Sequence, residues 1–239
     1  MKMFETGIST VMADNICFSA KLSHGHIYNL IDKKVDRIFM PYIVFENKAD
    51  KETNNSFNCP IVTGYSDVIK SAISPEKNFN IPIDAPTFTF ANKKLMKRAS
   101  EKYLKTLLPN ITSTQFENAF KNALKAQNDY EHELNCRAKE ILEDAVTENR
   151  LVVLLAGRPY HIDSLIQHKI ADMITDFGVD VITEDIVRDM QVNTNKVQSV
   201  MQWEYTNRVF KSALWAANEA PQNLSYVQIT SFGCGPDAF

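Results

Sequence analysis

The sequence has few glycines and cysteines, no long apolar run and no excess of positive charge. Only seven of its 239 residues are glycine and four are cysteine. No apolar run approaches the roughly 20 residues that a membrane-spanning helix needs, and the residues from Met1 to Glu5 lack the apolar core of a secretory signal. The formal net charge of -3 gives no positive field that would hold a nucleic acid backbone. We therefore expect a cytoplasmic chain that binds neither membrane nor nucleic acid.

The chain also lacks the short motifs of common nucleotide-dependent and hydrolytic enzymes. It contains no G-x-G-x-x-G, no Walker A sequence and no G-x-S-x-G. These patterns mark dinucleotide sites, P-loops and hydrolase nucleophiles. The motifs therefore assign no nucleotide and no catalytic residue.

The N-terminal part instead alternates strand-like and helix-like segments. Residues 8–13 are short and apolar and favour a strand, residues 20–35 carry apolar side chains at helical spacing, and residues 37–45 form an apolar run typical of a buried strand. Residues 60–63 favour a further short strand. The order strand, helix, strand predicts a parallel βαβ unit.

The middle of the sequence, residues 92–149, is charged and helical in pattern. It is interrupted at Pro109, and Thr114 and Glu117 have the spacing of a capping box for the second helix. We interpret this segment as a helical connector.

The C-terminal part alternates strand and helix throughout. Residues 151–156, LVVLLA, form the clearest buried strand, and further strands are predicted over residues 179–183 and 225–230. Short loops between them favour a parallel sheet. The sequence thus predicts an α/β fold with Rossmann-like parallel sheets in two α/β halves joined by the helical connector. The expected parts are residues 1–91, residues 92–149 and residues 150–239.

Unusual residues follow the three C-terminal strands. Open parallel sheets bind ligands beyond the carboxyl ends of their strands, so we predict that these residues meet at one rim. Glu184 and Asp185 follow the second strand and have helix capping as an equally weighted alternative. The predicted cofactor-binding residues follow the first and third strands and are Arg158, Tyr160, His161, Gly233 and Gly235.

Three of the four cysteines occupy positions that suit a metal ligand or a reactive thiol. Cys17 and Cys59 precede expected helices or element junctions, where a helix N-terminus would stabilise a thiolate. Cys234 lies between two glycines and fits a metal ligand or a reactive thiol. The three thiols together are candidates for a metal cluster, although the absence of a C-x-x-C motif is evidence against one. Cys136 lies within a predicted helix and is expected to be structural.

Five strings of the sequence are specific enough to indicate a family. In the same order, they resemble the uncharacterised domain of CoA-substrate-specific enzyme activases, which is related to 2-hydroxyacyl-CoA dehydratase activases. The resemblance covers most of the chain outside the helical connector, and GRPYHID and SFGCG are its most specific motifs. The strings are NICFSAKLSHGHIYNLI, VDRIFMPYIVFEN, FNCPIVTGYSDVIK, LLAGRPYHIDSLIQHKIADMITDFGVDVITED and YVQITSFGCGPDA.

The resemblance implies a functional context. In such proteins the domain accompanies an ASKHA-type ATPase, which drives an electron into a 2-hydroxyacyl-CoA dehydratase, and a region similar to the dehydratase subunits that hold [4Fe-4S] clusters by cysteines. It thus implies a [4Fe-4S] cluster at Cys17, Cys59 and Cys234. The implied partners are the ATPase activator domain or the dehydratase-like region, in cis or in trans.

The leading hypothesis is a module of the 2-hydroxyacyl-CoA dehydratase and activase system that binds an iron-sulfur cluster or a dehydratase-like partner and has no activity of its own. Two alternatives stay open. One is a dehydratase-like electron-transfer component that acts on an acyl-CoA, with Arg158 near a phosphate or carboxylate. The other is a structural interaction domain without a cofactor. Relatives of the family have a strand and a helix before the segment that matches residues 1–7, so we expect this chain to be part of a longer polypeptide.

Overall fold

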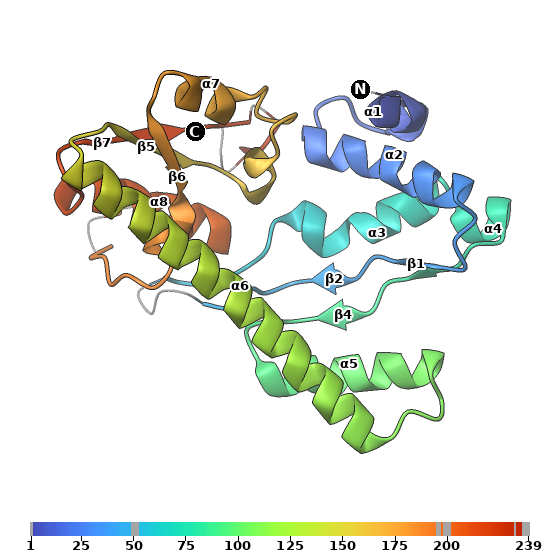
Figure 1. Cartoon of the computed structure of the whole chain (residues 1–239). Coiled ribbons are helices and arrows are strands. Elements are labelled where there is room, and N and C mark those ends of the chain that lie inside the picture. The colour runs from blue at the N-terminus through green and yellow to red at the C-terminus, as the bar shows by residue number, and fades with distance from the viewer. Residues whose placement is uncertain (1, 49–52, 195–196, 198–201, 232, 236–239) are drawn as a thin grey trace. The chain divides into compact units, whose positions relative to one another are not determined.

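The protein has a mixed α/β fold with short parallel strands (Figure 1). It divides into two compact units. The first comprises residues 1–47, 57–110 and 231–239, and the second comprises residues 48–56 and 111–230. The expected connector, residues 92–149, supplies α5 (Lys93–Leu107) to the first unit and α6 (Ser113–Thr147) to the second. The computed structural model describes residues 2–48, 53–194, 197, 202–231 and 233–235.

The first unit contains two parallel pairs of short strands. In one pair β1 lies beside β3, and in the other β2 lies beside β4. The helices α3 and α4 connect β2 to β3, so a parallel strand-helix-strand arrangement is present, but it lies between residues 38 and 88 rather than between residues 8 and 45. The bounds are β1 (Ile38–Phe39), β2 (Tyr42–Ile43), α3 (Pro60–Ala72), α4 (Pro75–Phe79), β3 (Ile83–Asp84) and β4 (Thr87–Phe88).

The two strand pairs form one interrupted ladder because they share a register. At this register the carbonyl of Met40 would accept a hydrogen bond from the N–H of residue 86, but Pro86 has no N–H. The ladder is therefore broken between the two pairs. On both sides of the break, the N–H groups of Ile38, Met40, Tyr42 and Val44 donate to the carbonyls of Pro82, Asp84, Pro86 and Phe88 at 2.8 to 3.3 Å.

Two glycines let α1 (Lys2–Gly7) lie directly on α2 (Phe18–Asp32), as Figure 1 shows. A Cβ atom on Gly25 would lie 1.7 Å from the carbonyl oxygen of Met3, and one on Gly7 would lie 2.3 Å from the backbone nitrogen of Gly25. Only glycine at these positions permits such close backbone contact.

Two strands predicted for the first unit are wrong. The strand expected over residues 8–13 is a single 3₁₀ turn, η1 (Ile8–Thr10), that continues α1. A short apolar run does not by itself distinguish strand from helix, and the packing of α1 on α2 decides the outcome. The strand expected over residues 60–63 is the first turn of α3, because Pro60 occupies a position where a helix tolerates proline.

The apolar core of the first unit lies where α2 and α3 meet β1 and β3. These elements bury mainly isoleucine side chains. The core residues are Ala20, Ile27, Ile31, Ile38, Tyr65, Ile69, Ile73, Ile81 and Ile83.

The second unit is built on a three-stranded parallel sheet with the order β6-β5-β7. All five residues of the central strand β5 (Val152–Ala156) are buried, as its sequence predicted. The chain passes from β5 to β6 (Asp180–Thr183) on one side, and then to β7 (Leu224–Gln228) on the other. The connections therefore diverge between β5 and β7, the kind of position where parallel sheets bind ligands.

Helices and 3₁₀ turns complete the second unit. The capping box of α6 is formed by Thr112 and Gln115, two residues before the predicted Thr114 and Glu117, because the helix begins earlier than expected. Among the described residues, no helix is both long and apolar enough to cross a membrane. The remaining elements are η2 (Pro159–Ile162), α7 (Ile170–Asp176), η3 (Glu184–Val187) and α8 (Glu204–Asn218).

Candidate functional site

Cys17 and Cys59 cap two helices of the first unit. Cys17 is the residue before α2, and Cys59 is the residue before α3. Both thiols are free and partly buried. The N-terminus of a helix carries partial positive charge, which interacts favourably with a negatively charged group placed there. Cys17 packs against the same apolar core as Ile61, in the first turn of α3, so the two helix starts share one core.

Gly233 lies against Cys17. A Cβ atom on Gly233 would lie 3.0 Å from the Cα atom of Cys17 and 3.3 Å from its backbone nitrogen. The adjacent residue, Cys234, is partly buried, and its N–H donates to the carbonyl of Ser231 at 2.9 Å. The structure thus places the glycine-flanked segment directly beside the start of α2. At Gly235 a Cβ atom would meet no atom within 4 Å among the described residues, so no close contact there requires glycine.

Hydrogen bonds link His24 to Thr10 and to Tyr65, and Tyr65 interacts with Cys17. The Nε2 atom of His24 lies 2.9 Å from the hydroxyl of Tyr65, and its Nδ1 atom lies 2.8 Å from the hydroxyl of Thr10. Burial raises the pKa of Tyr65, and the nearby charge of Cys17 raises it further. Burial lowers the pKa of His24, which has no exposed surface. Burial therefore favours the neutral form of both groups.

These neighbours were not found in the sequence. His24 was noticed there only as part of His24-Gly25-His26, and Thr10 and Tyr65 are too far apart in the sequence to form a recognisable spacing. The hydrogen bond between His24 and Tyr65 depends on the packing of α2 on α3. No local sequence pattern predicts that packing.

No single-ion site is present among the residues that the structure describes. No group of three or more histidine, cysteine, aspartate or glutamate side chains in that part of the chain could hold one metal ion. In a four-iron cluster each thiolate binds a different iron, so the sulfurs do not converge on one point. Cysteine side chains such as those of Cys17, Cys59 and Cys234 are the ligand type that such a cluster requires.

A second group of candidate residues lies at the carboxyl end of β5, in the second unit. The Nδ1 atom of His161 accepts a hydrogen bond of 3.0 Å from the N–H of Arg158, and a Cβ atom on Gly157 would lie 2.5 Å from that same Nδ1. The ring of Tyr160 contacts the ring of His161 edge to face, with centroids 4.5 Å apart. Arg158 and His161 are 6% and 7% exposed, so both are buried.

Glu184 lies at the end of the neighbouring strand β6. Burial raises its pKa to about 7, and the charge of Asp185 adds to this, whereas the backbone N–H groups of Glu184 and Gly157 and the charge of Arg208 act in the opposite direction. The carboxyl group is therefore next to the end of β5. Thr183 is the N-cap residue of η3, and the carboxyl group of Glu184 accepts a hydrogen bond from its own backbone N–H in the first turn.

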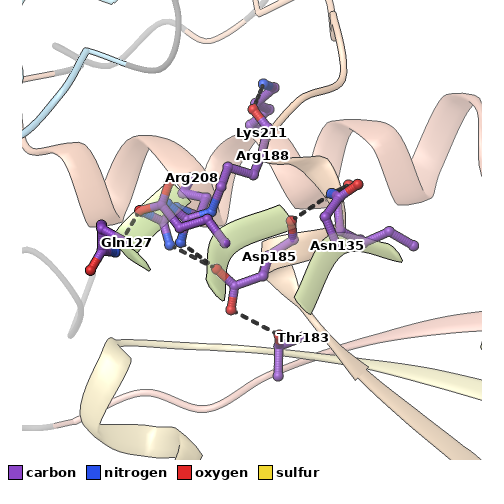
Figure 2. A network of polar contacts seen from close by, with 9 residues as sticks. Gln127, Asn135, Thr183, Asp185, Arg188, Arg208 and Lys211 are labelled. Atoms are coloured by element: carbon purple, nitrogen blue, oxygen red, sulfur yellow. Dashed lines mark hydrogen bonds and ion pairs between the residues drawn. The ribbon is translucent and has the colours of Figure 1, made fainter. Parts of the chain in front are cut away.

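Asp185 is the centre of a polar network that joins α6, η3 and α8 (Figure 2). Its Oδ1 atom accepts hydrogen bonds from Arg188 at 2.7 Å and from Arg208 at 3.1 Å, and its Oδ2 atom accepts one from Thr183 at 3.1 Å. Asn135 of α6 donates to the carbonyl of Asp185 at 3.2 Å. No local pattern predicts this network, since its members come from α6, β6, η3 and α8 and from the residue after η3.

The candidate residues fall into the two units. Cys17, Cys59, Gly233, Cys234 and Gly235 belong to the first unit, and the group around β5 belongs to the second. The single rim expected for both groups stays a prediction.

Comparison with known proteins identifies the family. Searches of curated proteins and of solved structures gave no match. The model of one family, described as CoA enzyme activase uncharacterised domain, matches residues 1–187. This range includes the starts of α2 and α3 and the group at the end of β5, and it covers more than half of the sequence. The chain therefore belongs to the CoA enzyme activase uncharacterised domain family.

Proposed function

We propose that this chain is an iron-sulfur module of the CoA enzyme activase system, in which Cys17, Cys59 and Cys234 bind a [4Fe-4S] cluster. The main observation in its support is the contact between Gly233 and Cys17, which brings two thiol-bearing segments together although they are far apart in the sequence. Family membership supports the role in the activase system.

The surroundings of the thiols suit negatively charged sulfur. Cys17 and Cys59 lie at the positive ends of α2 and α3. Burial favours the neutral form of Tyr65, so its phenol adds no negative charge beside Cys17. A bound cluster would supply one-electron transfer. The electron partner would be an ASKHA-type ATPase activator domain or a dehydratase-like region, in cis or in trans.

Anaerobic reconstitution with iron and sulfide tests the proposal. We expect a brown protein with about four iron atoms per chain. Replacing Cys17, Cys59 or Cys234 with alanine should reduce the bound iron and the absorbance of the cluster.

Cys136→Ala is the matched control, because Cys136 lies on α6 with its sulfur 3.5 Å from the Nε2 atom of His132. It should keep the full iron content. A colourless wild-type protein with a native circular dichroism spectrum would contradict the proposal, as would equal iron loss in all four variants.

A further inference from the structure

A cavity of about 640 Å³ lies in the first unit, and none of its lining residues is a cysteine. Its walls include Val44 and Phe45, which follow β2, Phe88, at the end of β4, and one face of α5. It therefore lies at the carboxyl ends of two parallel strands, where open α/β sheets bind ligands. Its volume is in the range of small-molecule sites.

One part of the wall is apolar. The ring of Phe45 stacks on the ring of Phe57 with a centroid distance of 4.7 Å, which fixes that side of the cavity. Phe88 and Leu95 also line the cavity, and Leu95 is 54% exposed although it is a large apolar residue. An apolar ligand group would remove this surface from water.

The other part of the wall carries positive charge. Arg98 and Lys102 line the cavity and lie four residues apart on α5, so they share one helix face. Like charges at this spacing destabilise a helix. Within the described ranges neither side chain forms an ion pair, and the sole carboxylate of α5, Glu101, pairs with Lys105 at 2.7 Å.

We propose that this cavity binds an amphipathic organic anion. Its apolar body would lie against Phe45, Phe88 and Leu95, and its carboxylate or phosphate group would lie between Arg98 and Lys102. The planar guanidinium of Arg98 suits the paired oxygens of such a group. An acidic head group would form charge-assisted hydrogen bonds with Arg98 and Lys102 that a neutral ligand cannot form. The inference depends on neither the cluster nor the activase role.

Calorimetric titration of the whole chain tests this site with ligands of one chain length. The probes are decanoate and decyl phosphate, with decanol and decyltrimethylammonium as the uncharged and cationic counterparts. We expect one anion to bind per chain, roughly tenfold tighter than decanol, as charge-assisted hydrogen bonds would give. Equal affinity for decanol and the anions, or no binding of either anion, would overturn the proposal.

Charge variants on α5 assign the site. The double variant Arg98→Gln with Lys102→Gln should weaken anion binding roughly tenfold. The matched control, Lys93→Gln with Lys94→Gln, removes the same charge from the same helix outside the cavity and should change the affinity less than about twofold. Equal effects of the two double variants would show that only the general charge of α5 matters and would refute the site.

A steric variant supplies an independent check. Ala99 lies on the same face of α5 and lines the cavity, so Ala99→Phe should abolish binding of the anions while thermal unfolding stays cooperative. Unchanged binding by this folded variant would place the ligand elsewhere and reject the inference.

Discussion

The two units build parallel sheets from very different strands. In the first unit four two-residue strands form a broken ladder that contains Pro82 and Pro86, whereas in the second unit a fully buried five-residue strand pairs on both sides. The first unit relies on the close packing of α1, α2 and α3, and the second on its sheet and on the network around Asp185. The same fold class can thus be stabilised mainly by helix packing or mainly by a buried sheet.

Asp185→Ala tests whether the second unit depends on the network around this carboxylate. The change leaves Arg188 and Arg208 without their shared carboxylate, and the side chain of Arg208 is only 10% exposed. Uncompensated buried charge is costly, so we expect a loss of about 4 kcal/mol in the free energy of unfolding. Hydrogen exchange should show lost protection in β5, β6 and α8. Lost protection confined to α2 and α3 would contradict the assignment of this network to the second unit.

Glu184→Gln should change the pH dependence of the second unit. The folded pKa of about 7 lies above the ordinary carboxyl value of 4.5. Below pH 4.5 the group is protonated in both states and contributes nothing. As pH rises from 4.5 to 7, the unfolded state loses its proton first, so the wild type loses up to about 3 kcal/mol of stability. Urea unfolding at pH 4 and pH 8 measures this effect.

The Gln side chain can still accept a hydrogen bond from the Gly157 N–H but cannot ionise. The variant should therefore gain stability relative to the wild type between pH 4 and pH 8. A constant difference between the two proteins over this range would show that Glu184 does not titrate as described.

In the first unit, Gly25→Ala tests the contact between α1 and α2. Its Cβ atom would overlap the carbonyl oxygen of Met3, so the helices must separate. We expect a loss of about 2 kcal/mol, the usual size of an overpacking effect, measured by urea unfolding. Gly64→Ala is the control, because Gly64 lies within α3 and a Cβ atom there would meet no described atom within 4 Å. It should be neutral or stabilise α3 by up to about 1 kcal/mol.

Pro86→Ala tests whether the missing N–H at position 86 causes the break between the two strand pairs of the first unit. The substitution supplies the N–H that the carbonyl of Met40 lacks, and it also removes the rigidity of proline. These effects oppose each other, so the free energy of unfolding should change by less than about 0.5 kcal/mol. The new amide at position 86 should nevertheless be protected from hydrogen exchange. Rapid exchange there would show that the two strand pairs do not join.

The sequence predicted those parts of the fold that local patterns determine. The run LVVLLA has no polar interruption, and β5 is confirmed where it was expected. Residues 8–13 could not be assigned correctly, because the turn at Ile8–Thr10 continues α1 and depends on the contact between Gly7 and Gly25. Residues 60–63 were equally ambiguous until the position of Pro60 at a helix start was known.

The candidate site was predictable only in part. Cys17 and Cys59 were placed before helices or junctions from sequence, and they are the N-cap residues of α2 and α3. The raised pKa of Glu184 was not predictable, since it comes from burial and from the neighbouring end of β5. Nor could local patterns pair Gly233 with Cys17, because that contact joins the two ends of the sequence.

The contact of Gly233 with Cys17 has a consequence for the order of folding. It closes a loop of about two hundred residues, and the entropy lost in closing a loop grows with its length. Contacts of such long range form slowly compared with the helices they join. The contact between Cys17 and the segment that contains Gly233 is therefore expected to form late, after the intervening chain has folded.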